Sequence, residues 1–403
     1  MLRIVGSELR HRKAVWLITV LALVILGGLF AREHFMQHRY IQTYAERLQK
    51  GIVTQKKLDQ KDGIDIFGKR YQYELDKLHA GPMAYAAAYL PSLTTALEPN
   101  DGGRPKINYI ASRAIGVTGS GPIFGGHEWD NTIHELTIVT KQKLLPFYPA
   151  RQLTDEMTAV HYGQDPDSYA DNIEMSAARF YTAGWYFIGH AVRENWLLPV
   201  ILLCVLSYGT LFANELNRNH RHLQLLTVNG VNPLALWAIR FALVVLTTVA
   251  AVVVPIGVFL LVSRPFAVGG SLRYPILIWH LDGTQTFTTL GNYLGRTAGL
   301  LLLVIILGYS VIMFWSVVTR NGLIAAVLTA LTAGVGFFIQ KIAWLPFSYL
   351  NVGAAGNGFT FYQMGHGTLT QAVIVLSGWS VGLLVITFGP LYRNRRYGYD
   401  FRN

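Results

Sequence analysis

The sequence contains little charge and only one cysteine. Asp, Glu, Lys and Arg make up 14% of its 403 residues, whereas the residues AVILMFWYC make up 52%, and the mean hydropathy is +0.32. Soluble globular proteins carry about 25% charged residues, and disordered chains are poor in apolar residues, so the composition excludes both classes. Because Cys204 stands alone, a disulfide-rich fold is excluded too. The composition predicts an integral membrane protein.

Motifs of catalysis are also missing. The pattern G-x-x-x-x-G-K-[ST], which binds nucleotide phosphates, is absent, and the glycine run 116–126 lacks the required Lys and Ser/Thr. The patterns H-E-x-x-H, G-x-S-x-G and C-x-x-C do not occur. We therefore predict that the chain is not an enzyme and has no catalytic residue.

The nearest approach to a metal site is the segment 127–135, which contains His127, Asp130, His134 and Glu135. On a helix, the first three would share one face, a geometry that Zn²⁺ could use. A loop entering a strand suits the same segment equally well. We predict that these residues serve structural packing, with no metal or cofactor site. A membrane enzyme that acts through His127, His134 and Glu135 stays a minor alternative.

Stretches without charge predict six membrane-spanning helices. About 20 helical residues cross the hydrocarbon core of a bilayer. The last charge-free stretch, 342–392, is too long for one span, so we place a re-entrant or interfacial segment at 341–368 and the helix after it. The first span lacks a cleavage pattern and is predicted to be an uncleaved anchor. The predicted spans are 14–31, 195–214, 241–263, 297–319, 321–340 and 369–390.

The positions of Lys and Arg predict the orientation. With the N-terminus inside, the cytosolic segments hold twelve Lys and Arg residues, against four in the short outer segments. This asymmetry predicts that both termini are cytosolic. It also indicates that the basic residues behind the net charge of +11 lie at the membrane surface, so we predict no nucleic acid as a partner. The cytosolic segments are 1–13, 215–240, 320 and 391–403, and the short outer ones are 264–296 and 341.

Residues 32–194 form a long insertion between the first two spans, predicted to be a mixed but mainly helical extracytoplasmic domain. We expect helices at 32–62, 71–97 and 172–195, the last one running straight into the second span. Some strand is expected within 101–147, because of alternating pieces such as ELTIVT. An interfacial aromatic belt is predicted at Phe180, Tyr181, Trp185, Tyr186 and Phe187.

Charged residues near the spans are predicted to lie at helix ends and to extend towards the interface. An ion-coupled transporter usually has an acidic or basic residue at mid-membrane, and no predicted span has one. The sequence therefore offers no energy source of its own for uphill transport. The residues concerned are Glu215, Arg240, Arg296, Arg320 and Lys341.

The segment 215–240 has a basic first half, a leucine group, the turn residues Asn229 and Gly230, and an apolar helix start at Pro233. This pattern predicts a short amphipathic helix along the membrane, a break, and re-entry into the bilayer. Two interpretations stay open. The segment could anchor two spans on anionic lipid, or it could dock a cytosolic partner through its leucines.

The order of these elements resembles the type-2 permease subunits of ATP-binding-cassette exporters, in the branch with a large domain between spans 1 and 2. Four segments carry the resemblance, and Asn229-Gly230 replaces the proline usual in the family. The segments are GWYF at 184–187, Phe212-Ala213-Asn214-Glu215, the basic stretch 218–222, and Leu225-Leu226 followed by Thr227 to Pro233.

The resemblance implies a transport unit in a bacterial plasma membrane, with two ATPase subunits and a second, identical or sibling, permease. ATP and Mg²⁺ would bind to the ATPase, and the cargo would be amphiphilic, such as a peptide, antibiotic or lipid. The N-terminal segment 1–13 would be an amphipathic interface helix. A membrane-anchored sensor or assembly protein with a ligand-binding outer domain is the main alternative. The coupling residues implied are Glu215, Arg218, Arg221, Leu223, Leu225, Leu226, Asn229 and Gly230.

Overall fold

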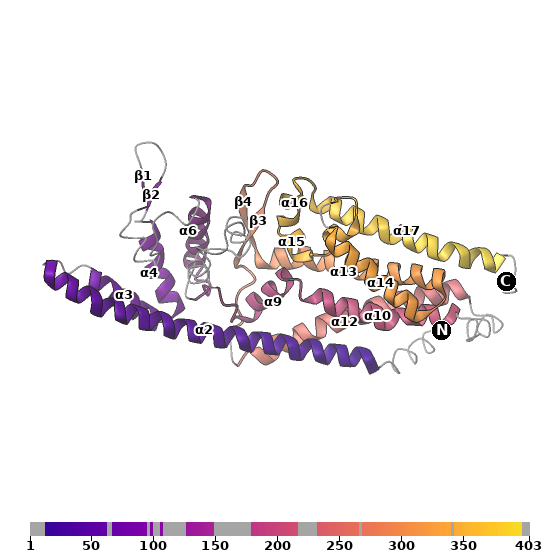
Figure 1. Cartoon of the computed structure of the whole chain (residues 1–403), viewed down its shortest axis with the longest axis horizontal. Coiled ribbons are helices and arrows are strands. Elements are labelled where there is room, and N and C mark those ends of the chain that lie inside the picture. Colours follow the sequence, from indigo (N-terminus) through magenta and orange to yellow (C-terminus); the bar gives the residue numbers. More distant parts are fainter. Residues whose placement is uncertain are drawn as a thin grey trace. The chain divides into compact units, whose positions relative to one another are not determined.

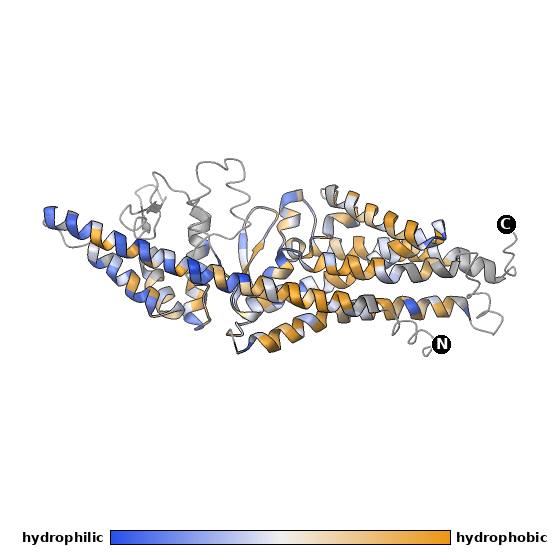
Figure 2. Cartoon of the chain, turned by 60° about the horizontal axis from the view of Figure 1, so that its bottom comes forward, coloured by the Kyte–Doolittle hydropathy of each residue, from blue (hydrophilic) through white to orange (hydrophobic). Residues whose placement is uncertain are grey.

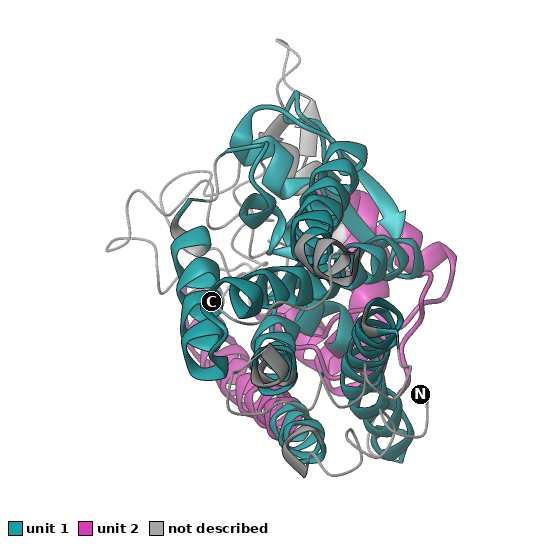
Figure 3. Ribbon diagram, turned by 90° about the vertical axis from the view of Figure 1, so that its right-hand side faces the viewer, with its two compact units in different colours: residues 1–27, 188–265, 276–403 teal, residues 28–187, 266–275 magenta. Residues whose placement is uncertain are grey.

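A computed structural model describes most of the chain, and it divides into two compact units (Figure 3). The bundle unit comprises 1–27, 188–265 and 276–403, and the inserted unit comprises 28–187 and 266–275. The two units are described separately below. The residues described are 13–62, 67–94, 97–99, 105–107, 126–148, 179–216, 232–265, 268–339 and 342–396.

Long apolar helices build the bundle unit (Figures 1 and 2). Within the described residues, four helices are long and apolar enough to cross a membrane, or five if a bent helix pair counts as one span. A further apolar helix, α14, has 17 residues and is shorter than these. The chain is therefore a multi-pass helical membrane protein. The helices are α2 (Lys13–Asp62), of which residues 13–27 belong to this unit, α10 (Leu197–Leu216), α12 (Pro233–Ser263), α13 (Leu290–Thr319), α14 (Gly322–Phe338) and α17 (Leu369–Arg396).

Helix α12 begins at Pro233, the helix start predicted from the sequence and upstream of the charge-free span 241–263, and α13 begins at Leu290, upstream of its predicted span 297–319. Asn232 caps α12 by accepting from the Leu234 N–H at 3.2 Å, and Thr289 caps α13 by accepting from the Asn292 N–H at 3.2 Å. Arg240 and Arg296 therefore lie inside helices, and their prediction as end residues is wrong. Arg320 does end α13, in a left-handed conformation with φ 53°.

Helix α13 lies at the centre of the bundle unit and packs against α10, α14 and α17. Its approach to α10 is close because glycines face large side chains there. A Cβ on Gly308 would lie 3.1 Å from Val205, and one on Gly209 would overlap the Ile312 side chain. Small residues of this kind let membrane helices approach closely.

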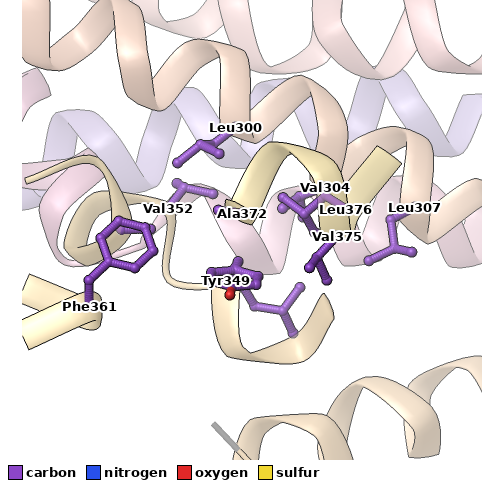
Figure 4. Close-up of a cluster of buried hydrophobic side chains, with 11 residues drawn as sticks. Leu300, Val304, Leu307, Tyr349, Val352, Phe361, Ala372, Val375 and Leu376 are labelled. Carbon is purple, nitrogen blue, oxygen red and sulfur yellow. The ribbon is translucent and has the colours of Figure 1, made fainter. Parts of the chain in front are cut away.

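Three short helices occupy the segment predicted to be re-entrant or interfacial. They are η1 (Pro346–Tyr349), α15 (Val352–Gly356) and α16 (Phe359–Met364). The Tyr349 hydroxyl donates to the Ala343 carbonyl at 2.7 Å, so this segment satisfies some of its own backbone acceptors. Its apolar side chains join α13 and α17 in one buried cluster (Figure 4), which consists of Leu300, Val304, Leu307, Tyr349, Leu350, Val352, Ala355, Phe361, Ala372, Val375 and Leu376.

The described residues of the inserted unit are mainly helical. The second half of α2 packs against α3 (Phe67–His79), α4 (Pro82–Thr94) and α6 (Gly126–Lys141). Strands β1 (Leu97–Pro99) and β2 (Pro105–Ile107) pair antiparallel, with Glu98 opposite Lys106. The core of this unit consists of Tyr44, Leu48, Ile52, Leu75, Leu78, Tyr85, Ala86 and Leu136.

The expected strand at ELTIVT is wrong, because these residues belong to helix α6. Leu136 and Val139 are buried, and Ile133 packs against the core of the inserted unit. Their spacing of three residues places them on one helix face. Burial of that face outweighs the weak strand preference of the β-branched residues.

The helical segment that leads into α10 is bent, whereas the sequence predicted that it would run straight into the second span. Helix α9 (Gly184–Arg193) and α10 meet at an angle of 66°. Asn195 takes a left-handed conformation with φ 57°. The Trp196 N–H donates to Ala191 O and the Asn195 N–H to Val192 O, which is the pattern of a helix C-terminus with asparagine in the place of glycine. Residues 172–178 lie outside the described residues.

The predicted aromatic belt is also corrected, because most of these rings are buried within the inserted unit. Tyr181, Tyr186 and Phe187 are no more than 6% exposed. Phe180 lies 5.4 Å from the ring of Tyr40, and Phe187 lies 5.1 Å from that of Phe30. These side chains form core contacts, so they are not available to lipid headgroups.

Candidate functional site

The predicted coupling segment is described only at its two ends. Glu215 lies in the last turn of α10. The other residues implied by the resemblance lie outside the described residues, so their roles stay predictions. They are Arg218, Arg221, Leu223, Leu225, Leu226, Asn229 and Gly230.

The two ends of this segment are held together by aromatic side chains. Phe212, near the end of α10, lies 5.4 Å from the ring of Trp237, which stands just inside α12. The Trp237 ring also lies 6.4 Å from that of Phe388 in α17. Phe212 and Trp237 are fully buried. We call Phe212, Trp237 and Phe388 the aromatic junction, since it joins three helix ends next to the predicted coupling segment.

Pro233 occupies the first position of α12, directly after the capping residue Asn232. Proline suits this position because its missing N–H would have no partner within the helix. The predicted helix start at Pro233 is confirmed. The aromatic junction itself was not predicted, because no local pattern shows that residues from three helices converge.

Arg240 lies one turn after Trp237 and is only 2% exposed. It was predicted to extend to the membrane interface, but its position inside α12 buries it in the bundle unit. Burying a charged group in apolar surroundings is costly. Arg240 therefore packs inside the bundle unit, one turn from the aromatic junction, and does not anchor the helix at the membrane surface.

Several buried hydroxyls farther along the bundle have hydrogen-bond partners within the protein. The hydroxyls of Thr248 and Tyr309 lie 2.6 Å apart, which links α12 to α13. Ser310 and Ser316 donate to carbonyls one turn earlier in α13, at 2.8 Å and 2.7 Å. These hydroxyls thus need no open aqueous path to complete their hydrogen bonds.

Within the segment considered as a metal site, Glu135 forms an ion pair with Arg179 and accepts a hydrogen bond from Tyr274. Both carboxylate oxygens of Glu135 accept from the Arg179 guanidinium, at 3.1 Å and 3.0 Å, and Oε1 also accepts from the Tyr274 hydroxyl at 2.7 Å. His134 is exposed, and the side chains of His127 and Asp130 are not described. Among the described residues, no group of three or more His, Cys, Asp or Glu could hold a metal ion.

Glu135, Arg179 and Tyr274 form a buried polar cluster in the inserted unit. The side chains of Arg179 and Glu135 are 8% and 10% exposed, and the guanidinium lies 5.2 Å from the Phe147 ring. Burial alone would lower the pKa of Arg179, but attraction to Glu135 raises it above its ordinary value. Burial, followed by the Glu135 charge, raises the pKa of Tyr274 well above its ordinary value.

The polar cluster fixes a loop that belongs to the inserted unit although both of its flanks belong to the bundle unit. Tyr274 lies in this loop, 266–275, which follows α12. The Trp185 N–H donates to the Gly269 carbonyl at 3.0 Å, and the Tyr274 ring lies 4.6 Å from that of Tyr186. Hydrogen bonds and ring contacts thus hold the described part of the loop to the core of the inserted unit.

No protein-family model matches the sequence, and no curated protein and no solved structure matches it either. The functional argument therefore depends on the residues and contacts of this chain.

Proposed function

We propose that this protein is the membrane-spanning permease subunit of an ATP-driven exporter in a bacterial plasma membrane. The observation that carries the proposal is the aromatic junction. It unites α10 and α12 at the two ends of the basic, leucine-containing segment that resembles a coupling element. A cytosolic ATPase that bound this segment would act on both helices at once.

A packed junction suits the transmission of movement. Phe212, Trp237 and Phe388 come from three helices, and densely packed side chains move together rather than deforming independently. Closure of an ATPase dimer on the segment would displace the ends of α10 and α12 as one body. The contact with Phe388 would carry α17 along.

The sequence supports a division of labour between subunits. Without a P-loop in this chain, ATP and Mg²⁺ bind to a separate ATPase, of which the complete unit contains two copies. A second permease, identical or related, completes the path through the bilayer. The long apolar bundle suits an amphiphilic cargo such as a peptide, an antibiotic or a lipid.

Leucine-to-aspartate changes in the predicted docking segment provide the first test. The full-length chain is co-expressed with a P-loop ATPase encoded beside it and purified through a tag on the chain. We expect Leu225→Asp with Leu226→Asp to abolish co-purification of the ATPase, because charge opposes entry into an apolar groove. The matched control, Leu225→Met with Leu226→Met, should retain it. Undiminished co-purification of the aspartate variant would contradict the proposal.

Labelling from each side of the membrane provides the second test. In a Cys204→Ser background, Arg221→Cys supplies a single thiol, which we expect to react with an impermeant maleimide only after the cytosolic face is opened. A thiol that reacts only from outside would place the segment on the wrong side for an ATPase. That outcome would favour the alternative, a membrane-anchored sensor or assembly protein without transport.

A further inference from the structure

A pair of buried hydroxyls joins two helices within the bundle unit. The hydroxyls of Thr248 in α12 and Tyr309 in α13 lie 2.6 Å apart, and we call them the hydroxyl pair. The Cys204 thiol of α10 interacts with Thr248. All three residues are fully buried, and each lies in the middle third of its helix. The hydroxyl pair therefore lies away from both ends of the helices that it connects.

Glycines bring α10 and α13 together close to this pair. Gly308, next to Tyr309 in α13, faces Val205 of α10. On α10, Gly209 faces the Ile312 side chain. Helices in such close contact can change their crossing angle more easily than they can separate, because separation would leave a void in a packed region. The glycine contact can thus act as a pivot between α10 and α13.

Helix α12 is attached to α10 at two points. The aromatic junction joins the two helices next to the predicted coupling segment, and Cys204 interacts with Thr248 farther along. The other face of α12 is open. Leu246 precedes Thr248 by two residues, which places it on the far side of the helix, and it is 62% exposed. We therefore expect α10 and α12 to move together.

The connection between α12 and α13 is long and does not by itself fix their distance. It contains a hairpin of strands β3 (Pro275–Trp279) and β4 (Gln285–Thr289). Tyr309 links the two helices within the bundle, since its hydroxyl meets Thr248 and its ring lies 6.5 Å from that of Phe241. Apolar contacts between helices can slide, whereas a hydrogen bond requires one distance and direction. The hydroxyl pair therefore selects a single closed arrangement of α12 on α13.

The strength of this link suits a contact that opens and closes. A hydroxyl that loses its partner in an apolar interior is penalised, so the closed arrangement is favoured. Hydrogen bonds between membrane helices are nevertheless weak on average, and losing one shifts an equilibrium about three- to fifteenfold. The hydroxyl pair can thus part without unfolding either helix.

We propose that the hydroxyl pair is a latch that closes the transport path between α12 and α13. The pair parts when α10 and α12 turn together about the glycine contact, because α12 lies outside that contact between α10 and α13. The gap is lined by the two hydroxyls, which can form hydrogen bonds with the polar part of an amphiphilic cargo. This inference rests on the proposed transport function, since it assigns a path to the movement that the ATPase drives.

Cys204 is the only cysteine of the chain and provides a reporter of this gap. The full-length protein in lipid nanodiscs, without an ATPase, is treated with the small reagent aminoethyl methanethiosulfonate, and the modified fraction is followed by mass spectrometry. A narrow gap admits this reagent, whereas a bulky maleimide dye requires unfolding of the bundle. We expect slow modification of the wild type, because Cys204 is buried.

Tyr309→Phe tests the latch because it removes one hydroxyl and keeps the ring. It should raise the rate of Cys204 modification about three- to fifteenfold. Ser310→Ala is the matched control. It removes the neighbouring buried hydroxyl, which donates to the Ile306 carbonyl within α13, and it should leave the Cys204 rate unchanged.

A second reporter detects general loosening of the bundle. In a Cys204→Ser background, Thr329→Cys places one thiol at a buried position of α14, a helix that packs on α10 and α13. Adding Tyr309→Phe should leave the rate at this thiol unchanged, because the hydroxyl pair holds α12 and not α14.

Equal Cys204 rates in the wild type and in Tyr309→Phe would overturn the latch. An equal rise at both reporters would overturn it too, since the whole bundle would then have loosened. In a complex that co-purifies with its ATPase, a slowly hydrolysed ATP analogue should raise the wild-type rate, and an unchanged rate would overturn the coupling of the latch to ATP. Loss of the ATPase in co-purification would instead contradict the proposed function, and the measurement without an ATPase would still decide the latch.

Discussion

Removing Glu135 should destabilise the inserted unit more than any single surface change. Glu135 accepts three hydrogen bonds, two from Arg179 and one from Tyr274. In Glu135→Ala, the Arg179 guanidinium would remain buried without its counter-charge. Breaking a buried pair in this way costs about 3–5 kcal/mol. With a urea dependence of about 2 kcal/mol per molar, the unfolding midpoint should fall by about 1.5–2.5 M.

Pulse proteolysis of the full-length protein in urea measures this midpoint, because cleavage within 28–187 reports unfolding of the inserted unit. The double variant Glu135→Leu with Arg179→Met removes both charges and should be less destabilised than Glu135→Ala, since no uncompensated charge remains. Tyr274→Phe loses one hydrogen bond to a charged group and should cost about 1.5–3 kcal/mol. A midpoint for Glu135→Ala within about 0.5 M of wild type would refute the reasoning.

Three further predictions concern both units. Trp237→Ala should lower the unfolding temperature of the bundle by at least about 6 °C, because emptying a buried tryptophan site costs about 3–5 kcal/mol. A maleimide dye that reacts with the buried Cys204 only on unfolding measures this. Gly209→Ala should lower the same temperature by about 2–10 °C, because its methyl group would overlap Ile312, whereas Gly257→Ala, which meets no neighbour, should not. Burial raises the pKa of Tyr274 and Tyr148 in the folded state. The inserted unit should therefore keep this stability below about pH 10, the unfolded value, and lose it as pH rises further. A Tyr274→Phe variant should lose less between pH 9 and 11 in the proteolysis assay.

Hydrophobic patterning predicted the presence of the apolar helices better than their limits. A charge-free stretch ends at the first Arg, but a helix ends where its backbone loses hydrogen-bond partners. The capping residues Asn232 and Thr289 therefore set the starts of α12 and α13, upstream of Arg240 and Arg296. Pro233 is visible in the sequence and predicted the first of these starts.

Tertiary contacts explain the remaining differences. The aromatic residues near 180–187 match an interfacial belt by composition, yet Tyr186 and Phe187 are buried because Phe147, Tyr274 and Phe30 pack against them. These partners are distant in the sequence. The same is true of Arg179, which pairs with Glu135. A single sequence shows neither pairing. The belt and metal hypotheses therefore assumed exposed side chains at Tyr186, Phe187 and Glu135, which the fold buries.

Helix α12 connects the two sites that matter most for the proposed transport function. Its first turns contain Trp237 of the aromatic junction, and its last residues lead directly into the loop 266–275, which belongs to the inserted unit. If an ATPase displaces the start of α12, the helix carries the displacement along its length. Tyr274 and Gly269 attach the loop to the inserted unit through hydrogen bonds to Glu135 and Trp185. Movement of the bundle would therefore reach the inserted unit through this loop as well as through α9, and weakening the polar cluster should uncouple the loop without affecting the docking of an ATPase.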